Sequence, residues 1–214
     1  IHLTPAEIKS LEKIVVIACG TAYHAGMIAK YAIEKWAKIS VEVEIASEYR
    51  YRDPIITKNT LVIAISQSGE TMDTLMALRH AKAAGARVLA ICNTNSSTIP
   101  RESDAVLYTH AGPEIAVAST KALLTQIIAV YLIGLHLGQV NGSLKDTEVR
   151  DLYKELLELP GKIEQILETV EPLRALTRTF AQNNTVLFLG RNIGYPVALE
   201  GALKLKELAY IHAE

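Results

Sequence analysis

The sequence predicts an α/β fold, in which helices cover both faces of a parallel β-sheet to make three layers. Short apolar runs rich in β-branched residues recur along the first half of the chain, and helical patterns separate several of them. Strands that alternate with helices of about ten to fifteen residues form βαβ units, and these units build parallel sheets. Five strands are expected, at residues 14–18, 41–45, 61–65, 87–92 and 105–108.

After the fifth strand the pattern changes twice. A long apolar helix near 119–138 is followed by a charged helical stretch with breaks near Pro160 and Pro172. A strand, a glycine turn and a helix then return at 185–207. They can be aligned on 13–34, although any two βα units share that pattern.

These changes divide the chain into parts. The sequence begins without an initiator methionine, and the lone strand and helix at its other end cannot bury a core, so we expect a chain that is cut from a longer protein at both ends. The expected parts are a lead-in at 1–11, a first domain at 12–141, a helical connector at 142–181 and the truncated start of a second domain at 182–214.

Composition excludes several classes of function. The chain has 214 residues, of which 50% are hydrophobic, and a formal net charge of -1. Its basic residues are spread out, so it lacks the positive patch that binds nucleic acid or an anionic membrane. Cys19 and Cys92 each end a predicted strand, which suits buried thiols in a reducing cytoplasm. The six histidines show no ligand spacing, so no metal is expected.

The most apolar stretch, residues 122–140, is long enough to raise the question of a membrane span. Polar side chains interrupt it at Thr125, Gln126, His136 and Gln139. Polar groups are rare inside membrane-spanning helices. The sequence therefore favours a buried core helix or an interface helix.

The loop SQSGET, Ser66 to Thr71, follows the third predicted strand and precedes a helical pattern. Open parallel sheets bind ligands at the carboxyl ends of their strands, where helix N-termini offer free N–H groups and a partial positive charge. Ser66, Ser68 and Thr71 add hydroxyl donors. Gly69 lets the backbone approach closely, and Gln67 can donate from its amide. The loop predicts a phosphate or carboxylate site, although these residues are also ordinary turn and N-cap residues.

Two other turns occupy comparable positions. CGTAY, residues 19–23, also joins a predicted strand to a helix, and Ser119 and Thr120 precede the long apolar helix. No P-loop or dinucleotide fingerprint follows any predicted strand, which disfavours a nucleoside triphosphate. The three turns could converge on one cleft.

The last helical pattern, expected over 197–214, carries a narrow charged stripe. At about 100° per residue, Glu200, Lys204 and Glu207 fall on one side, and apolar side chains occupy most of the remaining circumference. A solvated face would be broad, so this stripe suggests groups directed into a cleft. A carboxylate and an amine one turn apart can divide proton transfers next to a carbonyl. The alternative is an exposed ion pair between Glu200 and Lys204.

Four segments together resemble the isomerase part of the glutamine–fructose-6-phosphate aminotransferase family, also called glucosamine-6-phosphate synthases. SQSGET on its own fits sugar-isomerase (SIS) domains in general, whereas the other three segments are more specific. The resemblance covers nearly the whole chain and implies a flavodoxin-like first SIS domain followed by the start of a second. The segments are CGTAY, SQSGET, GPEIAVASTKA and LEGALKLKELAYIHAE.

The resemblance implies a reaction and partners. In this family, ammonia and fructose 6-phosphate yield glucosamine 6-phosphate without a metal or redox cofactor. The ammonia comes from glutamine through a separate glutaminase domain. The family is dimeric, and the apolar helix at 119–138 is a candidate for that interface. The implied protein is a cytoplasmic enzyme of amino-sugar biosynthesis.

The resemblance also implies roles for individual residues. Glu207 would move the proton between C1 and C2, Lys204 would assist at the amino group, and Glu200 would orient them. The phosphate would bind to loop SQSGET, and the sugar would lie beside it. The residues implied to contact substrate are Thr21, Ser66, Gln67, Ser68, Thr71, Val117 and Ser119.

The chain departs from the family pattern in ways that limit its expected activity. Ala22 stands where some members have a serine that adds a phosphate donor. The family's ring-opening histidine and Schiff-base lysine lie beyond Glu214, and His212 is not that histidine. We therefore expect this chain alone to bind a sugar phosphate without completing the reaction. Two other hypotheses stay open: a sugar-phosphate-sensing module without catalysis, and a simple aldose–ketose phosphate isomerase.

Overall fold

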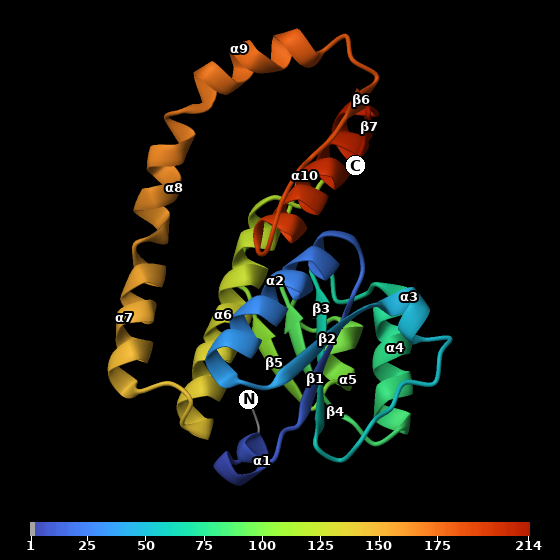
Figure 1. Ribbon diagram of the computed structural model, residues 1–214. Helices are drawn as coiled ribbons and strands as arrows, with labels where there is room; N and C mark the ends of the chain where they lie inside the picture. Colours follow the sequence, from blue (N-terminus) through green and yellow to red (C-terminus); the bar gives the residue numbers. More distant parts are fainter. Residues whose placement is uncertain (1–2) are drawn as a thin grey trace.

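A parallel five-stranded sheet between two layers of helices forms the centre of the computed structural model, which describes residues 3–214 (Figure 1). Every neighbouring pair of strands is parallel, in the order β2-β1-β3-β4-β5. The α/β class predicted from the sequence is confirmed. The strands are β1 (Lys13–Ala18), β2 (Ser40–Ile45), β3 (Thr60–Ser66), β4 (Arg87–Cys92) and β5 (Ala105–Tyr108).

Successive side chains of a strand point to opposite faces of the sheet, so the core is divided into two clusters, one on each face. In β1, Ile14 and Val16 pack into one apolar cluster, whereas Val15 and Ile17 pack into the other. β3 is buried along its whole length, because β1 and β4 flank it and helices cover both faces. Parallel strands buried in this way are apolar throughout, which is why the sequence pattern locates them.

Helices cover the two faces unequally. The face with Ile14 and Val16 carries α2 and α6, and the opposite face carries α3, α4 and α5. α2 follows β1 after one residue and α4 follows β3 after a short loop, so both N-termini lie at the carboxyl edge of the sheet. The helices of this part are α1 (Pro5–Lys9), α2 (Gly20–Ala37), α3 (Ala46–Tyr49), α4 (Met72–Ala83), α5 (Thr98–Glu102) and α6 (Lys121–Asn141).

The long apolar helix, α6, packs along α2. Val130, Ile133 and Leu137 belong to the core cluster, and Trp36 of α2 meets Tyr131 edge-on with ring centroids 5.3 Å apart. Among the described residues, α6 alone is long and apolar enough to cross a membrane, a test that core helices of soluble proteins also pass. Its packing against the sheet agrees with the expected core helix.

Three helices beyond α6 form an arm at one side of the molecule (Figure 1): α7 (Asp146–Leu157), α8 (Leu159–Leu167) and α9 (Val170–Phe180). Neither α7 nor α8 contains a buried residue. The expected breaks occur just before the two prolines rather than at them. Pro160 and Pro172 each lie in the first turn of a new helix, where a missing backbone N–H costs nothing.

The C-terminal segment contains β6 (Thr185–Val186), α10 (Gly194–Ala209) and β7 (His212–Ala213). The strand pattern at 185–190 yields only two strand residues, because within residues 3–214 the short β7 is the neighbour it pairs with. The expected helix over 197–214 is wrong at its end. Tyr210 takes a left-handed conformation with φ 55°, so the helix ends at Ala209 and residues 210–214 lie outside it.

Candidate functional site

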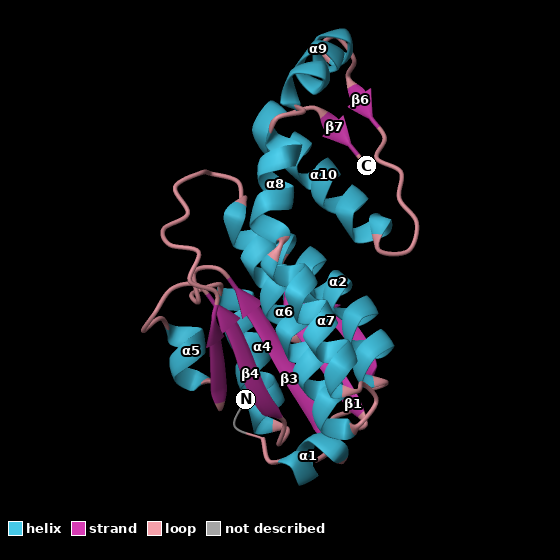
Figure 2. Cartoon of the chain, turned by 90° about the vertical axis from the view of Figure 1, so that its left-hand side faces the viewer, coloured by secondary structure: helices cyan, strands magenta, loops and turns pink. Residues whose placement is uncertain are grey.

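A pocket of about 180 Å³ opens at the carboxyl edge of the sheet. Its walls come from the start of α2, the loop between β3 and α4, and the first turns of α6 and the residues before it. In Figure 2, the loops after the carboxyl ends of β3 and β4 lie at the end of the sheet that points toward α10. The lining residues are Cys19, Thr21, Ala22, Ile65, Ser66, Gln67, Ser68, Thr71, Ser119 and Gln126.

The structure brings most of the expected substrate residues to this pocket. Thr21, Ser119 and the four named residues of loop SQSGET all line it. Val117 does not, since it is 97% exposed on the segment before Ser119. The convergence of the three turns is therefore a feature of the fold, whereas a role for Val117 stays a prediction.

Loop SQSGET is held in shape by the end of β4. The backbone carbonyl of Gln67 accepts hydrogen bonds from the N–H groups of Asn93 and Thr94, at 3.2 and 3.3 Å. Gly69 has φ +68°, and a Cβ there would lie 1.9 Å from Ser97 Oγ. A side chain at this position is excluded both by backbone conformation and by space.

The hydroxyl groups of the loop are left as hydrogen-bond donors. Ser66 Oγ accepts from the N–H of Gly69 at 3.0 Å, and Ser68 Oγ accepts from the N–H of Glu70 at 3.2 Å. A hydroxyl that accepts one bond still has its own hydrogen to donate. Thr71 Oγ1 lies 3.1 Å from Ser66 Oγ, and one of these two hydroxyls donates to the other, so two of the three O–H hydrogens remain for a ligand. Such a group suits an anion with several oxygens.

Helix N-termini strengthen the preference for an anion. α2 has no acidic residue in its first turn, and neither Cys19 nor Thr71 caps the helix that it precedes. The free N–H groups of a first turn carry a partial positive charge. The acidic residue in the first turn of α4, Asp73, lies 3.6 Å from Arg50, which offsets its charge.

The third wall is fixed by a residue whose role the sequence did not reveal. Glu114 accepts hydrogen bonds from the N–H groups of Thr120 and Ala122, both at 3.1 Å, and thereby caps α6. These bonds lower the pKa of Glu114 below its usual value. The cap occupies two N–H groups at the start of α6, and Ser119, just before that helix, brings its hydroxyl to the pocket.

The charged stripe of α10 faces α2 beside this pocket. Thr21 Oγ1 donates to Glu200 Oε1 at 2.9 Å, and Lys204 Nζ donates to Thr21 Oγ1 at 3.0 Å. Lys204 Nζ also lies 3.4 Å from Glu200 Oε1 and 2.5 Å from Glu207 Oε2. Thr21 is the shared residue, since it lines the pocket and contacts both charged groups.

Glu200 is buried rather than part of an exposed ion pair. It is 7% exposed, and its Oε2 lies 2.6 Å from His24 Nδ1. Burial alone would raise the pKa of Glu200, but hydrogen bonds with His24 and Thr21 and the charge of Lys204 outweigh it and lower the pKa. Glu200 is therefore held as a carboxylate between α2 and α10.

Two residues of this region were not expected from the sequence. His24 pairs with Glu200, and no motif distinguishes it from the other five histidines. Gln126 lines the pocket while only 2% exposed. Its signal was present in the sequence, because it interrupts the most apolar helix of the chain.

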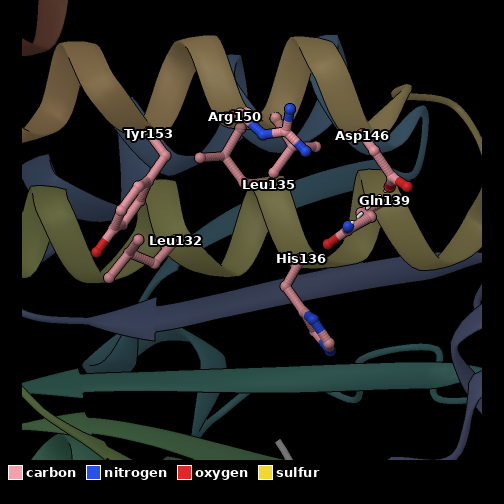
Figure 3. Close-up of a pocket in the computed structure, with 8 residues that line it drawn as sticks. Leu132, Leu135, His136, Gln139, Asp146, Arg150 and Tyr153 are labelled. Atoms are coloured by element: carbon pink, nitrogen blue, oxygen red, sulfur yellow. Dashed lines mark hydrogen bonds between the residues drawn. The ribbon is translucent and has the colours of Figure 1, made fainter.

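A larger hollow of about 430 Å³ lies elsewhere, between α6 and α7 (Figure 3). Its lining comes only from these two helices, with Leu132, Leu135 and Tyr153 among its apolar side chains. No serine or threonine lines it. It therefore lacks the cluster of hydroxyl donors that distinguishes the smaller pocket. Within residues 3–214, no three histidine, cysteine, aspartate or glutamate side chains gather in a way that could hold a metal ion.

Curated relatives align with this chain along its whole length, but the relatives themselves are much longer. Over 214 residues the chain is 66% identical to a glutamine–fructose-6-phosphate aminotransferase (isomerizing) from Streptomyces coelicolor, and over 213 residues it is 61% identical to a protein of the same name from Mycobacterium tuberculosis. These alignments cover 100% of this chain, but 35% and 34% of the two relatives. The chain thus spans about a third of the length of the curated relatives it matches.

A solved structure and a family model agree with these relatives. The C-terminal domain of glucosamine-fructose-6-phosphate aminotransferase from Francisella tularensis matches with a TM-score of 0.94 and 43% identity, over 98% of this chain and 60% of that chain. The family model described as SIS domain matches residues 7–135, which is more than half of the chain and includes the whole five-stranded sheet. The chain therefore belongs to the SIS domain family.

Proposed function

We propose that the chain is the isomerase part of a glutamine–fructose-6-phosphate aminotransferase, and that its pocket binds the phosphate of fructose 6-phosphate and of glucosamine 6-phosphate. The relatives carry that name. The observation that carries the proposal is the position of Thr21, which belongs both to the donor-rich pocket and to the Glu200–Lys204 pair. One residue thereby joins a site for an anion to a site for proton transfer.

The phosphate would be held by donors of loop SQSGET. Ser66, Gln67, Ser68 and Thr71 supply three hydroxyls and an amide around one pocket. Hydrogen bonds to a charged acceptor contribute on the order of 1.5–3 kcal/mol each. Several of them can hold a phosphate with a dissociation constant of roughly micromolar to millimolar without any lysine. The sugar would extend from there past Thr21 and Ser119, with Val117 proposed on the resemblance alone.

The chemistry would take place beside Thr21. Ammonia attacks the C2 carbonyl of fructose 6-phosphate, water leaves, and the resulting imine is isomerised. Glu207 would take the proton from C1 while the nitrogen beside Lys204 gains one, and it would then return the proton to C2 while the C1 hydroxyl loses its own and becomes the aldehyde. Glu200 would act as a positioning residue, because it is buried and contacts Thr21 and Lys204.

The partners follow from the same proposal. Ammonia would be released from glutamine by a glutaminase domain of the full-length protein, and no further cofactor is required for this isomerisation. We propose a homodimer in the cytoplasm, with α6 as a candidate for the interface. α6 leaves Leu124 45% exposed, which supports that choice.

Calorimetry tests the phosphate site. We expect saturable binding of fructose 6-phosphate and glucosamine 6-phosphate to this chain, weaker binding of inorganic phosphate, and none of fructose. Ser68→Ala should weaken the binding of both sugar phosphates by about tenfold. The matched control is Ser40→Ala, an exposed serine at the amino end of β2, which should leave affinity unchanged.

The same titration in the full-length protein separates two failures. Binding that appears only in the full-length protein would mean that further segments complete the site. If neither protein binds a sugar phosphate, the proposed function is wrong.

A further inference from the structure

Gln126 leaves a buried hydrogen-bond acceptor without a donor at the edge of the pocket. The residue is 2% exposed, and its Oε1 atom has no hydrogen-bond partner among the described residues. The other such atom, Tyr49 Oη, lies in α3 and does not line this pocket. Gln126 thus lines a polar pocket and carries an acceptor that no described residue satisfies.

This arrangement is costly for folding. Along the buried side of α6, the neighbours of Gln126 at about one turn are Ala122, Ala129 and Val130, all apolar. A buried amide oxygen without a donor destabilises the folded state, and an apolar side chain of the same size would avoid that cost. A bound molecule that donates to Oε1 would remove it.

The phosphate itself cannot be that donor. The hydroxyls of loop SQSGET offer hydrogens, which match the oxygens of a phosphate dianion. An amide oxygen needs the opposite partner, an O–H or N–H group. Gln126 differs in this respect from the hydroxyl residues that share its pocket.

We propose that Gln126 Oε1 accepts a hydrogen bond from a hydroxyl group of the sugar, and that this bond distinguishes a sugar phosphate from inorganic phosphate. The inference rests on the proposed function. It adds a specificity residue that acts on the uncharged part of the ligand. A site built to bond a hydroxyl rejects ligands that lack it, because its own buried group is then left unpaired.

Gln126→Met provides the test, because methionine has nearly the same length and shape but no acceptor of comparable strength. Dissociation constants for fructose 6-phosphate and inorganic phosphate are measured by calorimetry on the wild-type chain and on the variant. We expect fructose 6-phosphate to bind about tenfold more weakly, and inorganic phosphate to be unchanged within about twofold.

Two other variants serve as references. Ser68→Ala should weaken both ligands together. Gln139→Met is the matched control on the same helix, where the glutamine is exposed and its Nε2 donates to Asp146 at 2.9 Å, and it should weaken neither ligand. If Gln126→Met does not fold, Gln126→Asn, which withdraws the amide by one methylene, should show the same selective loss.

Each result decides the inference. Equal weakening of both ligands by Gln126→Met would overturn it, because the amide would then contact the phosphate. No weakening of either ligand would also overturn it. If the wild-type chain does not bind a sugar phosphate, the same variants are measured in the full-length protein; failure of both wild-type proteins to bind would contradict the proposed function, and the inference with it. A wild-type chain that binds normally, with an unselective variant, would contradict only the role of Gln126.

Discussion

Loop SQSGET and the charged face of α10 meet at Thr21, but they are held in place in different ways. The loop is held by backbone bonds, with the Gln67 carbonyl joined to the end of β4 and Gly69 packed against Ser97. The charged groups of α10 are held by side chains, through the contacts of Glu200 with Thr21 and His24. The proposed phosphate-binding loop is therefore fixed by backbone bonds to the sheet, whereas the proposed reacting groups of α10 are held by side-chain contacts with α2.

This difference separates affinity from turnover. Changes in the loop should alter the binding of phosphate, because the loop is proposed to provide its donors. Changes in α10 should alter the chemistry and the docking of that helix while the phosphate site survives. The following predictions test this separation, from the largest expected effect to the smallest.

Replacement of the proposed proton carrier should have the largest effect. In the full-length protein, Glu207→Gln should reduce kcat for glucosamine 6-phosphate formation by about 10²–10⁴-fold, since general acid–base groups contribute on that scale. Binding of fructose 6-phosphate should change little, because Glu207 does not line the pocket. Glu164→Gln, an exposed change on α8, is the matched control. Normal turnover of Glu207→Gln would mean that the catalytic role proposed for Glu207 is wrong.

Replacement of the loop glycine should have the next largest effect. Gly69→Ala should weaken sugar-phosphate binding by roughly a hundredfold, because the added Cβ overlaps Ser97 Oγ and displaces several donors at once. The strain should also lower the free energy of unfolding by about 1–3 kcal/mol. Calorimetry and thermal unfolding measure the two effects.

The chain offers a matched control for that strain. Gly85 also has a positive φ, of +90°, but no atom lies within 4 Å of an added Cβ. Gly85→Ala should therefore lower stability without altering affinity. If both variants lost affinity to the same extent, the loop would not be a shaped anion site.

Loss of His24 should weaken the packing of α10 without disturbing loop SQSGET. His24→Leu removes one partner of buried Glu200 and should destabilise the docking of α10 by about 1–2 kcal/mol. Hydrogen exchange should become faster in the amides of α10 and stay unchanged in those of β3, which serve as the internal reference. Affinity for phosphate should remain within about twofold, since loop SQSGET is intact. Equal exchange rates in α10 before and after the change would contradict this docking scheme.

Acid should produce a related, smaller effect through Glu200. Its pKa in the folded chain is lowered from 4.5, so its contribution to stability is present above that pH and is lost as pH falls through the lowered value. Protection of α10 amides from exchange should therefore decrease below about pH 4.5 relative to β3. Glu200→Gln has no such group to titrate and should show a flatter pH dependence. The same dependence in both proteins would assign the effect to another residue.

Much of the fold could be predicted because its signals are local. The five strands of the sheet are short, apolar and separated by helical patterns, and each begins and ends within about one residue of its predicted bounds. Loop SQSGET was identified because its donors are consecutive and follow a buried strand. The stripe on α10 was identified because one helix carries all three charged residues.

Other features depended on contacts between distant segments. β6 is shorter than its strand pattern predicts, because the length of a strand depends on the strand it pairs with. Composition does not show which strand that is. Glu114 caps a helix that begins several residues later, after a loop, so no fixed spacing announces it. The left-handed residue at the end of α10, Tyr210, is not one of the residue types that usually mark a helix end.

By itself, the sequence determined the α/β class, the place of loop SQSGET after a buried strand and the grouping of Glu200, Lys204 and Glu207 on one helix face. Periodicity and short motifs act within a few residues, and they are visible in one dimension. Only the tertiary structure decided that α10 packs on α2, that His24 and Thr21 hold Glu200, and that Gln126 ends at the pocket with an unmet acceptor. Those facts depend on which surfaces bury one another, and burial is a property of the packed chain rather than of any segment of it.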